Sequence, residues 1–213
     1  MTGLRERQKA GRRRDILAAA SQLFRKDGFA DTSVEAIAAL AEVGTGTVYN
    51  YFSSKGDLLM ALVALDGEQV RAKGKRYIAS VSGDAATALY GLLAIYVDHS
   101  LVHLTKELWR NAMATAVTQA DSPFGTGYFE NDRLLAEQVG ELVTALQAKG
   151  KLRADIDPVV TGSALFTVVN GLFMQFVARD AMPKAALHAK LREQVTLLCS
   201  GLATEAASQR KRA

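Results

Sequence analysis

A short segment over residues 42–59, EVGTGTVYNYFSSKGDLL, collects side chains that could bind the edges and the backbone of a nucleic acid. Threonine and tyrosine hydroxyls can donate to phosphate oxygens, and the amide of Asn50 can pair with an adenine edge. Gly44 and Gly46 carry no side chain, so the backbone there can approach a phosphate closely. With polar groups at the starts of the two flanking helices, the candidate DNA contacts are Thr32, Ser33, Thr45, Gly46, Thr47, Tyr49, Asn50 and Lys55.

A second interpretation of this segment remains open. A surface turn would also use glycines, helix caps and aromatic rings that pack on the core. In either case we expect Tyr51 and Phe52 to serve packing rather than recognition. The spacing therefore favours nucleic-acid binding without establishing it.

Helices are predicted on both sides of the segment. The first covers residues 13–26, and its apolar face consists of Ile16, Leu17, Ala20, Leu23 and Phe24. Gly28 provides a stop signal. Thr32 and Glu35 have the spacing of a capping box, so Thr32 is the expected N-cap of a short helix, and a second short helix is expected over about residues 45–51. Three such helices make a helix-turn-helix unit.

The remaining sequence also shows helical periodicity. Helices are predicted over 55–80, 83–102, 105–117, 132–150, from Pro158 onward, and 184–206, with residues 119–131 as a loop because of Pro123, Gly125 and Gly127. No run alternates with a period of two, so the predicted fold class is all-α. The predicted domains are a basic arm with the helix-turn-helix, residues 1–54, and a larger helical domain, residues 55–213.

Composition favours a cytoplasmic protein. A single cysteine, Cys199, excludes an internal disulfide and a multi-cysteine metal site. The basic N-terminus lacks the uninterrupted apolar stretch of a secretory signal. Residues 1–14 hold six basic residues against Glu6 alone. A flexible arm of this charge often lies along phosphates, although a solvated tail that aids solubility remains open.

Two features of the sequence are also found in proteins of other functions. Residues 159–178 carry no charge and nearly match a bilayer in length, but small and polar residues interrupt them, so we expect a buried helix and no membrane span. His99, His103 and Glu107 lie four residues apart, as metal ligands on one helix face would. A helix break is expected among them, so we expect no metal and no other cofactor. Without a Gly-rich phosphate loop or a nucleophile elbow, no enzymatic activity is expected.

Residues 13–62 resemble the N-terminal domain of TetR-family transcriptional regulators. The resemblance rests on several motifs in a fixed order, namely Phe24-x-x-x-Gly28-Phe29, Thr32-Ser33-Val34-x-x-Ile37-Ala38, Gly46-Thr47-Val48-Tyr49-x-Tyr51-Phe52 and Ser54-Lys55-x-x-Leu58. It implies an all-helical homodimer whose first three helices bind double-stranded operator DNA. Among the candidate contacts, those on positions that commonly touch DNA in such proteins are Thr45, Thr47, Tyr49, Asn50 and Lys55.

The resemblance further implies a C-terminal domain that binds a small-molecule effector and dimerises through its last two long helices. Effector binding would change the tilt of the helix over 55–80 and release the operator. Repression is the usual outcome in the family, and activation is the alternative. A helical interaction protein or an enzyme without DNA binding is the alternative function.

Three positions depart from the family pattern. The turn usually has glycine where this chain has Glu42, a serine or threonine cap where it has Gly44, and often lysine where it has Thr45. The first change adds a negative charge near the DNA backbone and the last removes a positive one. Phosphate affinity is therefore expected to depend more on the basic arm.

Effector contacts are expected from the middle helices and the uncharged segment. The candidates combine rings, methionines and a few polar groups, and they are Tyr90, Tyr96, His99, Trp109, Met113, Phe166, Asn170, Phe173 and Met174. Such a mixture suits an apolar or weakly polar organic ligand, although ordinary core packing accounts for many of these residues. Small residues between Gly162 and Gly171 permit close helix approach, as a four-helix dimer interface would need.

Overall fold

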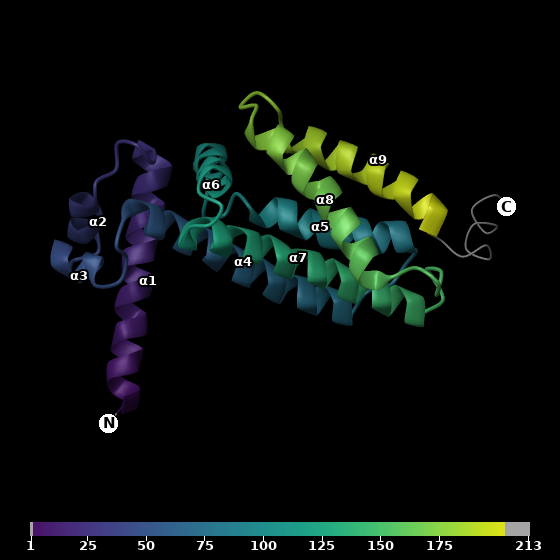
Figure 1. The fold of residues 1–213 in the computed structure, drawn as a ribbon, viewed down its shortest axis with the longest axis horizontal. Helices are drawn as coiled ribbons and strands as arrows, with labels where there is room; N and C mark the ends of the chain where they lie inside the picture. Colours follow the sequence, from purple (N-terminus) through teal and green to yellow (C-terminus); the bar gives the residue numbers. More distant parts are fainter. Residues whose placement is uncertain (1, 203–213) are drawn as a thin grey trace. The chain divides into compact units, whose positions relative to one another are not determined.

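The computed structural model describes residues 2–202, which form α-helices joined by turns, with no strand among them. This confirms the predicted all-α class. In chain order the helices are α1 (Thr2–Asp27), α2 (Val34–Leu40), α3 (Thr45–Tyr49), α4 (Lys55–Ala79), α5 (Ala85–His99), α6 (Lys106–Thr118), α7 (Pro123–Ala148), α8 (Pro158–Val177) and α9 (Lys184–Leu202) (Figure 1).

The helices pack into two compact units. The first unit holds the chain up to Asp66 together with Leu101–Phe129, and the second holds Gly67–Ser100 together with the chain from Glu130 onward. Helices α4 and α7 each supply residues to both units. These units are defined by how the helices pack, not by what they bind. The predicted boundary after residue 54, between a DNA-binding and an effector-binding domain, therefore stays a prediction.

Helix α1 is longer than its apolar pattern indicated. It begins at Thr2, so the arm that was expected to be flexible is helical over residues 2–14. The arm is rich in arginine, lysine, glutamine and glutamate, which are good helix formers, and adding turns to an existing helix costs no new nucleation. The first buried residue is Ile16, and the described side chains from Glu6 to Ala10 and from Arg12 to Asp15 are exposed.

The cap of α2 is Ser33 and not Thr32. Ser33 Oγ accepts from the backbone N–H of Ala36 at 3.1 Å. Thr32 is buried, and its hydroxyl donates to Gly28 O at 2.7 Å, which ties the loop to the end of α1. The capping-box spacing was therefore misleading by one residue, because the threonine hydroxyl donates to a carbonyl oxygen four residues earlier instead.

The segment 119–131 was wrongly predicted as a loop, since α7 begins at Pro123. Proline suits a first helical position because it has no N–H to leave unpaired. Ser122 Oγ caps this helix by accepting from Gly125 N at 3.1 Å. A Cβ on Gly125 would overlap the carbonyl oxygens of Gln119 and Ala120, so this glycine permits a tight helix start.

The other helix positions confirm the sequence pattern. Helix α4 covers most of the predicted range, and the break between α5 and α6 lies near residues 100–104. Asp157 caps α8 by accepting from Val159 N at 2.7 Å and Val160 N at 3.1 Å. The predicted last four residues of the final helix, 203–206, lie outside the described residues.

Helix α8 matches a membrane span in length and composition, and no other helix among the described residues does. It packs against α9 and α5 (Figure 1), and buried side chains such as Leu165, Val169 and Phe176 form its inner face. Length and composition alone do not distinguish a membrane span from the core helix of a soluble protein.

Candidate nucleic-acid interface

The backbone between α2 and α3 makes the sharp turn that a helix-turn-helix requires. Val43 N donates to Ala38 O at 3.0 Å, which closes the end of α2. Glu42 adopts a φ of 54°, in the left-handed region that favours glycine. Gly44 then leads into α3 as an extended N-cap without a side-chain hydrogen bond. The family pattern that places glycine at position 42 thus has a conformational reason, and Glu42 carries a backbone strain there.

One side of α3 is anchored in the core and the other is free. Val48 is fully buried. Ile37, Ala38 and Phe52, in the same unit, are buried as well. Tyr49 is 50% exposed, Gly46 and Asn50 are also exposed, and Thr45 and Thr47 are half-buried. Phe52 is buried and Tyr51 half-buried, as expected for packing residues. Among the candidate DNA contacts on α3, Tyr49 and Asn50 are more exposed than Thr45 and Thr47.

The glycines at the start of α3 are not required by the fold. A Cβ on Gly46 would meet no atom within 4 Å, and one on Gly44 would meet only Thr47 Oγ1 at 4.0 Å. Neither glycine has a positive φ. The fold therefore gives no reason for glycine at these two positions. The close approach of an external molecule to the backbone would give one.

Gly46→Ala should separate folding from binding. Alanine inside a helix is more stable than glycine by roughly 0.5–1 kcal/mol, so the free energy of unfolding should be unchanged or higher. If the bare backbone approaches DNA, the added methyl group should weaken binding to a target duplex by about ten-fold, or roughly 1.4 kcal/mol. Urea unfolding and a fluorescence anisotropy titration measure the two effects. A variant that is more stable and binds equally well would contradict this use of Gly46.

Three of the predicted contacts have internal roles. The Lys55 ammonium donates to Ala30 O at 2.9 Å and Thr32 O at 3.0 Å, and it lies 4.8 Å from the centre of the Phe29 ring. Lys55 thus ties the start of α4 to the loop between α1 and α2. Ser33 is the cap of α2, and the Thr32 side chain is buried. We therefore leave the Thr32 side chain out of the contacts proposed below.

The start of α6 is fixed to the end of α1 inside the first unit. Glu107 Oε1 accepts from Phe29 N at 3.3 Å, Ser21 Oγ donates to His103 O at 3.0 Å, and Arg25 donates to Val102 O. These contacts were not predicted from the sequence, in which Glu107 was considered as a metal ligand and no metal was expected. Among the described residues no three His, Cys, Asp or Glu side chains gather as a metal site would need.

Comparison with known proteins decides the family. The family model described as bacterial regulatory proteins, tetR family, matches residues 16–62. The HTH-type transcriptional repressor NicS of Pseudomonas putida is 30% identical over 164 residues, which cover 73% of this chain and 72% of that protein. The chain belongs to the TetR family.

Two further similarities extend over most of this TetR-family chain. The HTH-type transcriptional regulator UidR of Escherichia coli K12 is 25% identical over 184 residues, or 84% of this chain and 89% of that protein. A TetR-family regulator from Pectobacterium atrosepticum has the same fold, with a TM-score of 0.73 at 23% identity, covering 94% and 98% of the two chains. The chain is a helix-turn-helix transcriptional regulator.

The structure divides the effector candidates of this TetR-family regulator between the two units. Trp109 and Met113 lie on α6 in the first unit, and the others lie in the second. The buried members are Tyr96, His99, Trp109, Phe166 and Phe173. Met174 is 58% exposed, on the outer face of α8, so the structure does not support its assignment to an internal pocket. The half-buried Tyr90 shares a hydrogen bond of 3.1 Å with His188 Nδ1.

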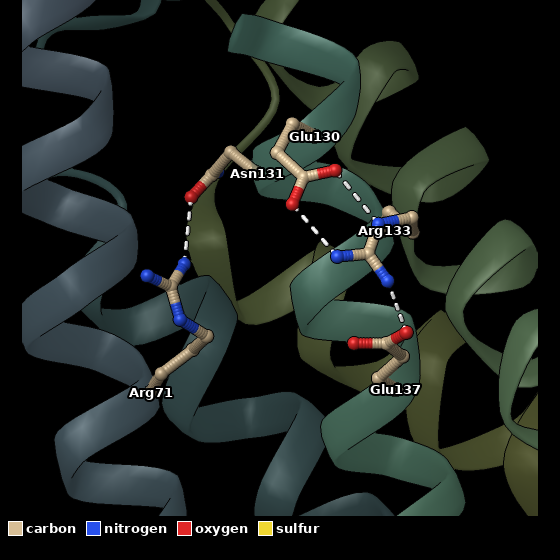
Figure 2. Close-up of polar contacts among 5 residues, drawn as sticks. All are labelled: Arg71, Glu130, Asn131, Arg133 and Glu137. Atoms are coloured by element: carbon tan, nitrogen blue, oxygen red, sulfur yellow. Dashed lines mark hydrogen bonds and ion pairs between the residues drawn. The ribbon is translucent and has the colours of Figure 1, made fainter.

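A polar seam lies between α4 and α7, and it was not predicted from the sequence. It consists of Gly67, Arg71, Gly74, Asn131 and Gln138. A Cβ on Gly67 or Gly74 would overlap the amide of Asn131 or Gln138, so each glycine makes room for an amide. Arg71 donates to Asn131 Oδ1 at 2.9 Å (Figure 2). The available signal was the spacing, since the glycines and the amides are each seven residues apart on their helices.

Gln138 extends this seam to α5. Its Nε2 donates to Arg71 O at 2.8 Å, and its Oε1 accepts from the Tyr96 hydroxyl at 2.9 Å. Burial, with a further contribution from Glu141, raises the pKa of Tyr96, which keeps its hydroxyl protonated as a donor. The polar groups of Tyr96 and Gln138 therefore bond to each other and to the backbone inside the protein. Tyr96, one of the effector candidates, is accordingly explained as a core residue.

The outer faces of α8 and α9 expose apolar and small side chains. Val160 is 66% and Leu197 is 71% exposed. Ser163, Ala164 and Thr167 are exposed on the same side of α8 as Val160, at helical spacing. A contiguous face of this kind on the last two helices fits the expected dimer interface of the family.

Proposed function

We propose that this regulator is a homodimeric repressor that binds operator DNA through α3 of each subunit and is released by a small organic effector. The observation that carries the proposal is the exposed side of α3, where Gly46, Tyr49 and Asn50 face outward on a helix held from behind by Val48. A major groove roughly 12 Å wide accepts one helix, and residues near its start reach base edges.

The proposed contacts follow from exposure. Asn50 reads a base edge or binds the backbone, and Tyr49, Thr45 and Thr47 donate hydroxyls to phosphates. Ser33 contributes at the start of α2. Lys55 stays a proposed phosphate contact, although its internal hydrogen bonds make its main role the support of the α1–α2 loop.

Release of the operator is proposed to involve more than one helix. Helix α4 supplies residues to both units, so a change in its tilt would move the recognition helix, as the sequence led us to expect. Helix α6 carries the candidates Trp109 and Met113, and its Glu107 accepts a hydrogen bond from Phe29 N in the turn after α1. An effector that contacts α6 would thus act directly on the DNA-binding unit. Any shift is limited by the effector's differential affinity for the two states.

Retention of the upstream region of its own gene in a gel-shift experiment tests the proposal. Specific retention that weakens steeply as salt rises supports operator binding through phosphate contacts, because counterions are released on binding. A protein that shows no preference for that fragment over genomic competitor is not a specific regulator of it. Transcription from the fragment in vitro then separates repression from activation.

The helical arm should contribute to affinity through phosphates. Its exposed basic residues within the described side chains are Arg7, Lys9, Arg12, Arg13 and Arg14. Arg12→Gln with Arg14→Gln should weaken binding to all DNA sequences and flatten the slope of log affinity against log salt by up to about two, at roughly 0.9 for each phosphate contact. Lys73→Gln with Lys75→Gln, which removes equal charge from exposed positions on α4, is the control. Equal slopes in both double variants would contradict a role for the arm.

A further inference from the structure

Among the side chains that the structure describes, none forms an ion pair with the carboxylate of Asp132, which belongs to the second unit. It lies on α7, and its Oδ2 accepts from Asn170 Nδ2 of α8 at 3.1 Å. An isolated carboxylate that leaves water is costly, because one neutral amide cannot replace its hydration.

The neighbouring arginines are engaged elsewhere. Arg133, the next residue on α7, donates to Glu130 at 2.7 Å through both Nε and Nη2 and also pairs with Glu137 (Figure 2). Arg71 of α4 points to Asn131 in the same view. Helix α8, which supplies Asn170, contains no charged residue over Pro158–Val177. None of the described side chains therefore neutralises Asp132 by an ion pair.

The pKa of Asp132 also indicates an unbalanced charge at the Asp132–Asn170 pair. Burial raises the pKa of Asp132 to about 6, although the hydrogen bond from Asn170 lowers it. The carboxylate is thus mostly ionised at pH 7.5, and it would gain from a positive charge placed beside it. Carboxyls perturbed by burial are enriched at ligand sites.

Aromatic rings complete the arrangement. Phe166 and Phe173 lie one turn before and one turn after Asn170 on α8, and both are buried. Rings hold the apolar body of a ligand, and their faces attract a cation. We propose that Asp132 and Asn170, beside Phe166 and Phe173, form the polar end of an effector site for an organic ammonium ion with an apolar body.

This inference rests on the proposed function and names the chemical class of its effector. It also replaces the uncharged ligand that the sequence suggested with a cationic one. The ammonium would donate to Asp132 and the body would pack against the rings. A carboxylate or phosphate ligand would be repelled at this position.

Calorimetric titration of the intact protein at pH 7.5 tests the ligand class. The probes are 4-phenylbutylamine, 4-phenylbutan-1-ol and 4-phenylbutyrate, which share a body and differ in the terminal group. The amine should bind about ten-fold tighter than the alcohol, and the carboxylate should bind least. Equal affinity for amine and alcohol, tighter binding of the carboxylate, or no binding of the amine at millimolar concentration would overturn the inference.

A matched pair of variants locates the contact. Asp132→Asn keeps the shape and removes the charge, so it should reduce the amine to the affinity of the alcohol. Glu68→Gln removes an exposed carboxylate from α4 in the same unit and should leave the amine's advantage unchanged. An unchanged advantage in Asp132→Asn would overturn the inference. Operator retention is measured on the unaltered protein, so a failure of the proposed function is seen separately from a failure to bind the amine.

Discussion

Replacing Tyr49 and Asn50 by alanine should abolish specific operator binding and leave the folded dimer intact. Tyr49 is 50% exposed and Asn50 is exposed at the end of α3, so neither side chain holds the core together. A good contact to a base edge is worth about 1–3 kcal/mol, and a phosphate contact adds to this. A combined loss of roughly 3 kcal/mol lowers affinity more than a hundred-fold.

Anisotropy titration of a labelled operator measures this loss, with circular dichroism and size-exclusion chromatography as tests of fold and dimer. Val117→Ala with Thr118→Ala is the matched control, because both residues are exposed on α6 in the same unit. The control should bind as the parent does. Parental affinity in the α3 double variant would show that the recognition surface lies elsewhere.

Asp132→Asn should stabilise the free protein at neutral pH. Burial raises the pKa of this carboxyl from 3.8 to about 6, so the folded state holds the proton more tightly than the unfolded chain. Stability is therefore lost as pH rises from about 4 through 6, and the loss persists above that range. A shift of two units corresponds to at most about 3 kcal/mol, and because Asp132 is only partly buried we expect about 1–2 kcal/mol.

The pH dependence distinguishes this cause from better packing. Below about pH 4 the carboxyl is protonated in both states, so the advantage of the variant should vanish there. Urea unfolding at pH 7.5 and at the lowest pH where the protein stays folded, at one fixed protein concentration, measures both values. A destabilised variant at pH 7.5, or an equal gain at both pH values, would contradict a desolvated Asp132. A gain at neutral pH would also mean that this carboxylate costs the fold stability, as groups kept for binding often do.

The helix-turn-helix could be predicted because its determinants are local. The apolar spacing from Ile16 to Phe24 defines one helix face, and Val48 follows the same rule in α3. The outward position of Tyr49 and Asn50 follows from that of Val48, since neighbours on a helix point to different sides. Start and stop signals such as Asp157-Pro158 also act within a few residues.

What failed depended on contacts that the spacing of residue types does not show. Thr32 looks like a cap until its hydroxyl is seen to donate to Gly28 O, and Lys55 looks free until it bonds the loop that ends in Thr32. Gly125 reads as a loop residue, although it permits the packed start of α7. The pairing of Asp132 with Asn170 joins positions that are 38 residues apart, and no local pattern marks it.

A footprint of the protein on the upstream region of its own gene tests most directly the claim that α3 docks in duplex DNA twice per symmetric pair. The account predicts two equally protected half-sites related by a twofold axis, with centres about 34–36 Å apart in the simplest arrangement, or a multiple of one helical turn. Protection of a single half-site, or uniform protection of the whole fragment at moderate salt, would contradict it.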